Sequence, residues 1–198
     1  MINIAIFASG GGSNSEIIIK HLPKLLQEKN TVAKVALILT NNANAGVLKI
    51  ALANNIPTAI LNLKDKTDDE VNETYFTFLK QHNITFIVLA GYLKKIPTAV
   101  INAYPQKIIN IHPALLPAYG GAGMYGMHVH DAVVAANETQ SGITIHFVDE
   151  VYDHGKIIFQ ATCLLEEGET GTSLAKKVLA LEHENYSNVI SYIISNFL

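Results

Sequence analysis

The sequence has no tryptophan and only one cysteine, Cys163, among its 198 residues. One cysteine excludes a disulfide within the chain, which is typical of cytoplasmic proteins. No run of about 18 apolar residues occurs, so no membrane span is expected. The first residues, Met1–Ala8, include Asn3 and have neither a basic leader nor a small-residue cleavage site, which predicts a strand rather than a signal peptide.

Positive charge is also scarce. The chain has 14 Lys and Arg against 17 Asp and Glu, a net charge of −3, and no long basic cluster. Proteins that bind nucleic acid usually carry a basic patch, so the sequence favours a small ligand instead. Hydrophobic residues make up 49% of the chain, enough for the core of one α/β domain.

Apolar runs alternate with amphipathic stretches in the first half of the chain. This pattern predicts a single doubly wound, mostly parallel sheet with helices on both faces. Ser13 and Glu16 have capping-box spacing, so Ser13 is predicted to cap the first helix, which Pro23 should kink or end early. The predicted strands are Ile2–Ala8, Val35–Leu39, Thr58–Leu61, Phe86–Leu89 and Ile108–Ile111, and the predicted helices are Ser13–Glu28, Ala45–Asn54, Asp68–His82 and Pro97–Ala103.

The pattern changes after the fifth strand. A glycine-rich loop, Ala118–Gly126, precedes a predicted helix at His128–Ala136. Two longer strands, Gly142–Val148 and Lys156–Leu164, are close enough in sequence to pair as an antiparallel edge of the sheet. The last helix is predicted to begin near Thr172, with Thr170 or Thr172 as its cap.

The first candidate site is the turn Ser9–Asn14, which contains three glycines between a strand and a helix. Free N–H groups at a helix start bind anions, and glycine lets the backbone approach them. A dinucleotide site would need glycine where Ser15 stands and an acidic residue after the second strand, which ends in Thr40–Asn42. The turn therefore predicts a site for one phosphate, with a tight turn that binds nothing as the alternative.

The second candidate site is the end of the fifth strand. Asn110 and His112 alternate to the same side of that strand, at the edge where open α/β sheets bind ligands. An amide can stabilise an oxyanion, and an imidazole can transfer a proton. Asp153, from the loop between the two late strands, could approach His112, raise its pKa and orient its ring. The alternative is a polar strand end and an ordinary turn aspartate.

A metal site is a weaker alternative. Five histidines occur in one stretch, but the pair His128 and His130 would not share a helix face, and the spacing matches no zinc signature. We therefore expect no metal. The five are His112, His128, His130, His146 and His154.

Taken together, these motifs resemble the phosphoribosylglycinamide formyltransferases, folate-dependent enzymes of purine synthesis, over nearly the whole chain. The run from Asn110 to Pro117 with a downstream aspartate is the most specific part. The matching segments are Ala8–Asn14, Val88–Leu93, Ile109–Pro117, Gly142–Val148, Asp153–Gly155 and Leu181–His183.

The resemblance implies a formyltransferase-like Rossmann variant that moves a formyl group from 10-formyltetrahydrofolate to the amine of glycinamide ribonucleotide. Asn110, His112 and Asp153 match the catalytic residues of the family. By the same match, the acceptor is held by Gly12, Ser13, Asn14 and Glu182, and the folate by Leu93, Lys94, Lys95, Ile96, Asn110, Val148 and Val151.

The resemblance further implies one domain over residues 1–198, with a phosphate-binding half (1–105) and a catalytic, folate-binding half (106–198), as a monomer or homodimer. Methionyl-tRNA formyltransferases share part of the motif but normally carry a second, RNA-contacting domain, which we do not expect here. The remaining alternatives are a 10-formyltetrahydrofolate hydrolase and a phosphate-binding module without catalysis.

Overall fold

Each apolar run in the first half of the sequence forms a strand of one sheet. The computed structural model describes residues 1–197. In chain order its elements are β1 (Ile2–Phe7), α1 (Ser13–Glu28), β2 (Ala33–Thr40), α2 (Val47–Ala53), β3 (Thr58–Ile60), α3 (Asp68–Gln81), β4 (Phe86–Leu89), α4 (Thr98–Ala103), β5 (Ile108–His112), α5 (Met127–Ala135), β6 (Gln140–Phe147), β7 (Ile157–Leu164) and α6 (Gly171–Phe197).

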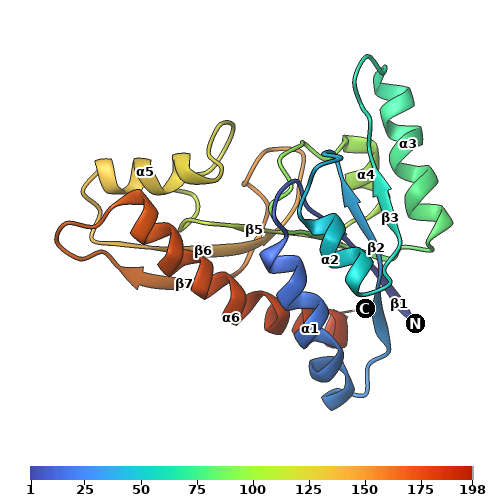
Figure 1. Ribbon diagram of the computed structural model, residues 1–198, viewed down its shortest axis with the longest axis horizontal. Coiled ribbons are helices and arrows are strands. Elements are labelled where there is room, and N and C mark those ends of the chain that lie inside the picture. The colour runs from blue at the N-terminus through green and yellow to red at the C-terminus, as the bar shows by residue number, and fades with distance from the viewer. Residues whose placement is uncertain (198) are drawn as a thin grey trace.

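The seven-stranded sheet has the order β3-β2-β1-β4-β5-β6-β7 (Figure 1). Strands β1 to β5 pair in parallel, whereas β6 and β7 run antiparallel to their neighbours. The predicted fold class and the antiparallel edge are therefore confirmed. The strand order reverses direction between β1 and β4, and ligands of open α/β sheets bind at such a switch point.

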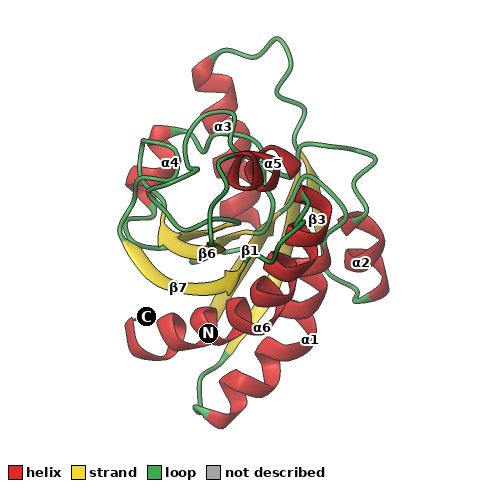
Figure 2. Cartoon of the chain, turned by 90° about the vertical axis from the view of Figure 1, so that its left-hand side faces the viewer, coloured by secondary structure: helices red, strands yellow, loops and turns green. Residues whose placement is uncertain are grey.

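Alternation along each strand divides the core into two layers. On β1, Ile4 and Ile6 face the layer built with α1, α2, α5 and α6, whereas Ala5 and Phe7 face the layer built with α3 and α4. Helices α1 and α6 lie side by side on their face in both views (Figures 1 and 2). Burial on both sides explains why these strands are largely apolar.

One expectation about the first helix is wrong. Gly12, not Ser13, is the N-cap, in the left-handed conformation with φ 85°, and no side chain caps this helix. The predicted bounds of the helix are confirmed, and α1 continues through Pro23 to Glu28. Gly12 is required because a side chain there would lie 2.8 Å from Cβ of Val47 on α2.

The last helix begins as predicted. Thr170 precedes α6, and its hydroxyl oxygen accepts the backbone N–H of Ser173, which satisfies one free donor of the first turn. Within residues 1–197, no helix combines the length and apolar character needed to cross a membrane.

Candidate active site

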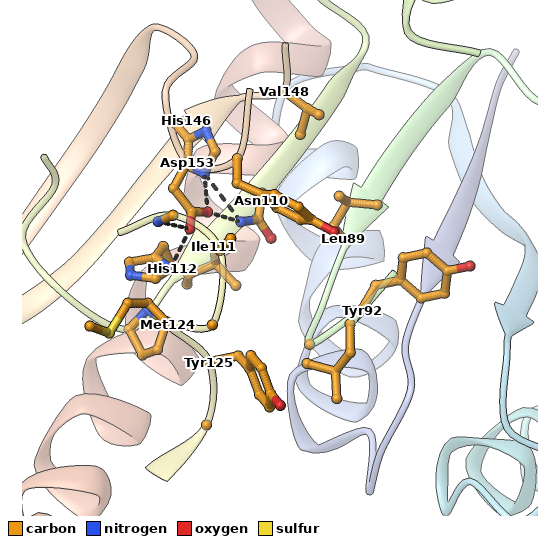
Figure 3. Close-up of a pocket in the computed structure, with 18 of the residues that line it drawn as sticks. Leu89, Tyr92, Asn110, Ile111, His112, Met124, Tyr125, His146, Val148 and Asp153 are labelled. Atoms are coloured by element: carbon orange, nitrogen blue, oxygen red, sulfur yellow. Dashed lines mark hydrogen bonds and ion pairs between the residues drawn. The ribbon is translucent and has the colours of Figure 1, made fainter. Parts of the chain in front are cut away.

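A cavity of about 560 Å³ opens beside the carboxyl ends of β4 and β5. Its walls come from segments far apart in the sequence, which only the fold brings together (Figure 3). The lining consists of residues 91–96, 110–113 and 121–127, together with Asn14, Leu89, His130, His146, Val148, Asp149, Val151, Tyr152, Asp153, Ala175, Val178, Leu179 and Glu182.

The three residues predicted to be catalytic meet on one wall of this cavity. Asn110 and His112 project from the same side of β5, and Asp153 comes from the loop after β6. The Asp153 carboxylate lies 3.5 Å from Nδ1 of His112 and accepts a hydrogen bond of 3.4 Å from Nδ2 of Asn110. The carboxylate therefore contacts both side chains of the strand end.

The glycine-rich loop closes this wall. The backbone N–H of Gly121 donates to Oδ2 of Asp153 at 2.9 Å, and the carbonyl oxygen of Tyr119 lies 2.7 Å from Nε2 of His112. Gly120 packs so closely that a Cβ there would lie 3.2 Å from Cβ of Asp153. The loop thus contacts both His112 and Asp153 through its backbone.

Burial sets the ionisation of this pair. The pKa of His112 lies below its ordinary value because burial of the ring outweighs the attraction of Asp153 and the contact with Tyr119. Asp153 acts to raise the His112 pKa, as expected, but burial is the larger effect and sets the net direction. Burial alone would raise the pKa of Asp153, but the nearby His112 and the Gly121 N–H lower it.

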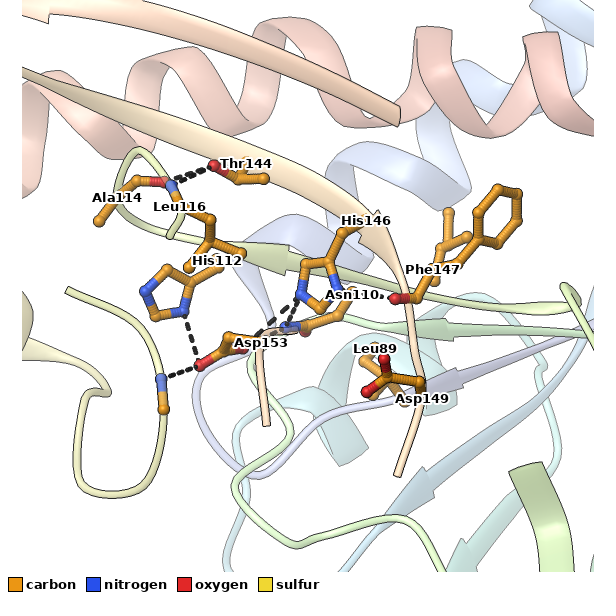
Figure 4. A network of polar contacts seen from close by, with 12 residues as sticks. Leu89, Asn110, His112, Ala114, Leu116, Thr144, His146, Phe147, Asp149 and Asp153 are labelled. Atoms are coloured by element: carbon orange, nitrogen blue, oxygen red, sulfur yellow. Dashed lines mark hydrogen bonds and ion pairs between the residues drawn. The ribbon is translucent and has the colours of Figure 1, made fainter. Parts of the chain in front are cut away.

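His146 is a member of this cluster that the sequence did not assign to the site. It lies on β6 directly opposite Asn110, with Nε2 3.1 Å from Nδ2 of Asn110 and 3.6 Å from Oδ1 of Asp153 (Figure 4). The available signal was a histidine between two apolar residues, Ile145 and Phe147, of a strand. No three His, Cys, Asp or Glu side chains are grouped to hold a metal ion within residues 1–197.

The predicted acceptor residues divide into two groups. Asn14 and Glu182 are buried in the cavity, where Nδ2 of Asn14 donates to Oε2 of Glu182 at 2.7 Å. Gly12 and Ser13 are absent from the cavity lining and lie at the start of α1, where Ser13 is exposed. Burial raises the pKa of Glu182 to about 7, although the Asn14 hydrogen bond opposes this shift.

The residues predicted to hold folate all line the same cavity. Leu93 and Val151 are largely exposed at its mouth, and Nζ of Lys95 lies 5.9 Å from the ring centroid of Tyr152. Ser9 ties this segment to the first turn, because its hydroxyl accepts the Leu93 N–H at 2.9 Å. The turn Ser9–Asn14 and the segment 91–96 are therefore directly hydrogen-bonded to each other.

Comparison with known proteins agrees with this architecture. The family model described as formyl transferase matches residues 2–190. The chain belongs to the formyl transferase family.

Among the relatives in this family are proteins named phosphoribosylglycinamide formyltransferase. The chloroplastic protein of Arabidopsis thaliana is 38% identical over 96% of this chain, and the Bacillus subtilis protein is 36% identical over 98%. This chain spans 64% of the Arabidopsis protein and 95% of the Bacillus subtilis protein. A crystal structure of the Bacillus halodurans protein of that name matches this chain with a TM-score of 0.86 and 35% sequence identity. The match covers 98% of this chain and 96% of the Bacillus halodurans chain.

Proposed function

We propose that this formyl transferase family member transfers the formyl group of 10-formyltetrahydrofolate to the primary amine of glycinamide ribonucleotide. The proposal rests on one observation: Asn110, His112 and Asp153 meet on the wall of a cavity that also contains Glu182. The names of the relatives at 36–38% identity support the same reaction.

The cavity has the chemistry that two such substrates require. Its apolar lining near Leu89, Tyr92 and Ile111 suits a flat heterocycle, and the buried pair of Asn14 and Glu182 suits the hydroxyl and amine groups of an acceptor. The start of α1 offers N–H groups to a phosphate. We propose that Gly12, Ser13 and Asn14 form this phosphate site, and that Leu93, Lys94, Lys95, Ile96, Val148 and Val151 contact the folate.

Amine attack on the formyl carbon forms a C–N bond and moves the carbonyl electron pair onto oxygen. The carbonyl then re-forms as the bond from carbon to the folate nitrogen breaks, and the proton lost by the amine passes to that nitrogen. A protonated His112 stabilises the negative charge on the oxygen. Its ring nitrogens face two acceptors, the Tyr119 carbonyl and the Asp153 carboxylate, which stabilise an imidazolium. Burial keeps the pKa of His112 low in the free protein. Positive charge on the ring is therefore favoured chiefly when the oxyanion forms beside it.

The reaction is tested by following loss of the formyl group from the folate with and without glycinamide ribonucleotide. Acceptor-dependent loss supports transfer, whereas acceptor-independent loss indicates a hydrolase and no loss indicates a binding module. We expect His112→Ala and Asp153→Ala to lower kcat about a hundredfold or more while both ligands still bind. His21→Ala, an exposed change on α1, is the control. Near-normal turnover in either site variant would refute these roles.

We also propose that the protein acts in the cytoplasm on small molecules, as a monomer or homodimer, and binds no nucleic acid. The single cysteine and the net charge of −3 support this. Cell fractionation, and size-exclusion chromatography with light scattering, measure the location and the assembly.

A further inference from the structure

His146 is nearly inaccessible to solvent, with 2% of its surface exposed, although it carries a polar ring. Both ring nitrogens have polar neighbours. Nδ1 lies 2.8 Å from the carbonyl oxygen of Phe147, and Nε2 lies 3.1 Å from Nδ2 of Asn110. A third polar neighbour, Oδ1 of Asp153, lies 3.6 Å from Nε2, beyond hydrogen-bond distance. The first two contacts therefore determine where the ring carries its proton.

A carbonyl oxygen only accepts hydrogen bonds, so the contact with Phe147 requires a proton on Nδ1 of His146. In the neutral ring the other nitrogen, Nε2, then has a lone pair and acts as an acceptor. The facing group is the amide nitrogen of Asn110, which only donates. The neutral ring with its proton on Nδ1 satisfies both contacts.

Asp153 places a second acceptor beside the same amide. Its Oδ1 lies 3.4 Å from Nδ2 of Asn110, so both N–H bonds of the amide point to acceptors, one on His146 and one on Asp153. The opposite amide orientation would place the Asn110 oxygen against a lone pair and a carboxylate. Figure 3 shows the observed orientation, with the nitrogen of Asn110 toward Asp153 and the oxygen turned away from it.

We propose that His146 is a positioning residue that turns the carbonyl oxygen of Asn110 into the cavity. This inference rests on the proposed function. There, the oxygen accepts an N–H of the attacking amine and directs the nitrogen lone pair at the formyl carbon. The sequence suggested instead that the amide nitrogen stabilises the oxyanion, but both of its protons are engaged in this arrangement.

The first test observes the tautomer directly and needs no activity. Protein labelled with ¹⁵N in histidine is studied at neutral pH by long-range ¹H–¹⁵N correlation NMR, and His146 is assigned from its absence in His146→Gln. We expect the shift of a protonated nitrogen at Nδ1 and of an unprotonated nitrogen at Nε2. A protonated Nε2 would overturn the proposal.

The second test asks whether His146 acts through Asn110. His146→Leu fills a similar volume with an apolar side chain but removes the Nε2 acceptor. We expect kcat to fall about tenfold or more, because small misplacements of reacting groups slow the reaction strongly. KM for both substrates should change little. His146→Gln can again accept from the amide and should recover most of the loss, whereas His21→Leu should match the wild type.

The double variant separates positioning from a general structural defect. If His146 acts only by orienting Asn110, then adding His146→Leu to Asn110→Ala should lower kcat no further than Asn110→Ala alone. Losses that multiply, or an unchanged kcat in His146→Leu, would refute the inference. Failure of the proposed function is distinct, because the wild type itself would then show no acceptor-dependent transfer.

Discussion

At the residue scale, the cavity contains a carboxyl group held in an apolar setting. Glu182 is 9% exposed, and its one hydrogen-bond donor, Nδ2 of Asn14, replaces only part of the lost hydration. Burial therefore raises the pKa of Glu182 from 4.5 to about 7. At neutral pH this carboxyl group is therefore close to its pKa, at a position that we propose binds the acceptor.

This shift predicts how stability depends on pH. Between about pH 4.5 and 7 Glu182 is protonated in the folded state but ionised in the unfolded state. The folded state then binds more protons, so the free energy of unfolding falls as pH rises through this window. We expect Glu182→Gln to be more stable than the wild type at pH 8, by up to roughly 3 kcal/mol, and nearly equal to it at pH 4.

Urea unfolding at the two pH values measures this difference, and the exposed Glu184→Gln is the control. The same variant should raise KM for the acceptor. A stability difference of equal size at both pH values would show that a packing change, rather than ionisation, is responsible.

At the element scale, the patterns that predict the strands and the bounds of the first helix proved reliable, but the predicted cap residue of that helix did not. Continuous apolar runs such as Phe86–Leu89 form strands because both faces of the sheet are covered. Ser13 had the spacing of a cap, yet the N-cap is Gly12 and Ser13 is the first residue of α1. The reason is the neighbouring α2, whose Val47 leaves no room for a side chain on Gly12.

The turn offers a matched pair of substitutions. Gly12→Ala places a Cβ at φ 85° and within 2.8 Å of Val47, so we expect it to lower the free energy of unfolding by roughly 2 kcal/mol. Gly10→Ala meets no atom within 4 Å and should cost much less. Urea unfolding compares the two variants. Equal losses would contradict the conformational argument.

At the scale of the whole molecule, the two halves share one sheet. Strand β4 of the first half pairs in parallel with β5 of the second, and α6 packs against α1 across the same core layer. The buried hydroxyl of Tyr186 on α6 also donates to the carbonyl oxygen of Leu89 at 2.8 Å. We therefore propose that residues 1–105 and 106–198 are functional halves of one cooperative domain.

The absence of tryptophan makes this proposal easy to test. Phe76→Trp on α3 reports on the first half, and Phe159→Trp on β7 reports on the second. We expect each single-tryptophan protein to show the same urea midpoint by fluorescence and by circular dichroism, because the shared core unfolds as one unit. Separate midpoints for the two probes of one protein would show that the halves unfold independently.

The amino-acid sequence by itself determined the strands, the parallel sheet with its antiparallel edge, and the residue types at the carboxyl end of β5. These features follow from local periodicity and from motifs a few residues long. The positions of Asn110 and His112 on one side of a strand needed no more than alternation.

Only the tertiary structure decided how those groups are charged and oriented. The net direction of the His112 pKa depends on burial among segments distant in sequence, and the place of His146 opposite Asn110 depends on the register of β5 with β6. Desolvation and hydrogen-bond partners arise from contacts across the fold. The sequence identifies the polar residues of the site, but the packing of the folded chain around them determines which of them carry protons.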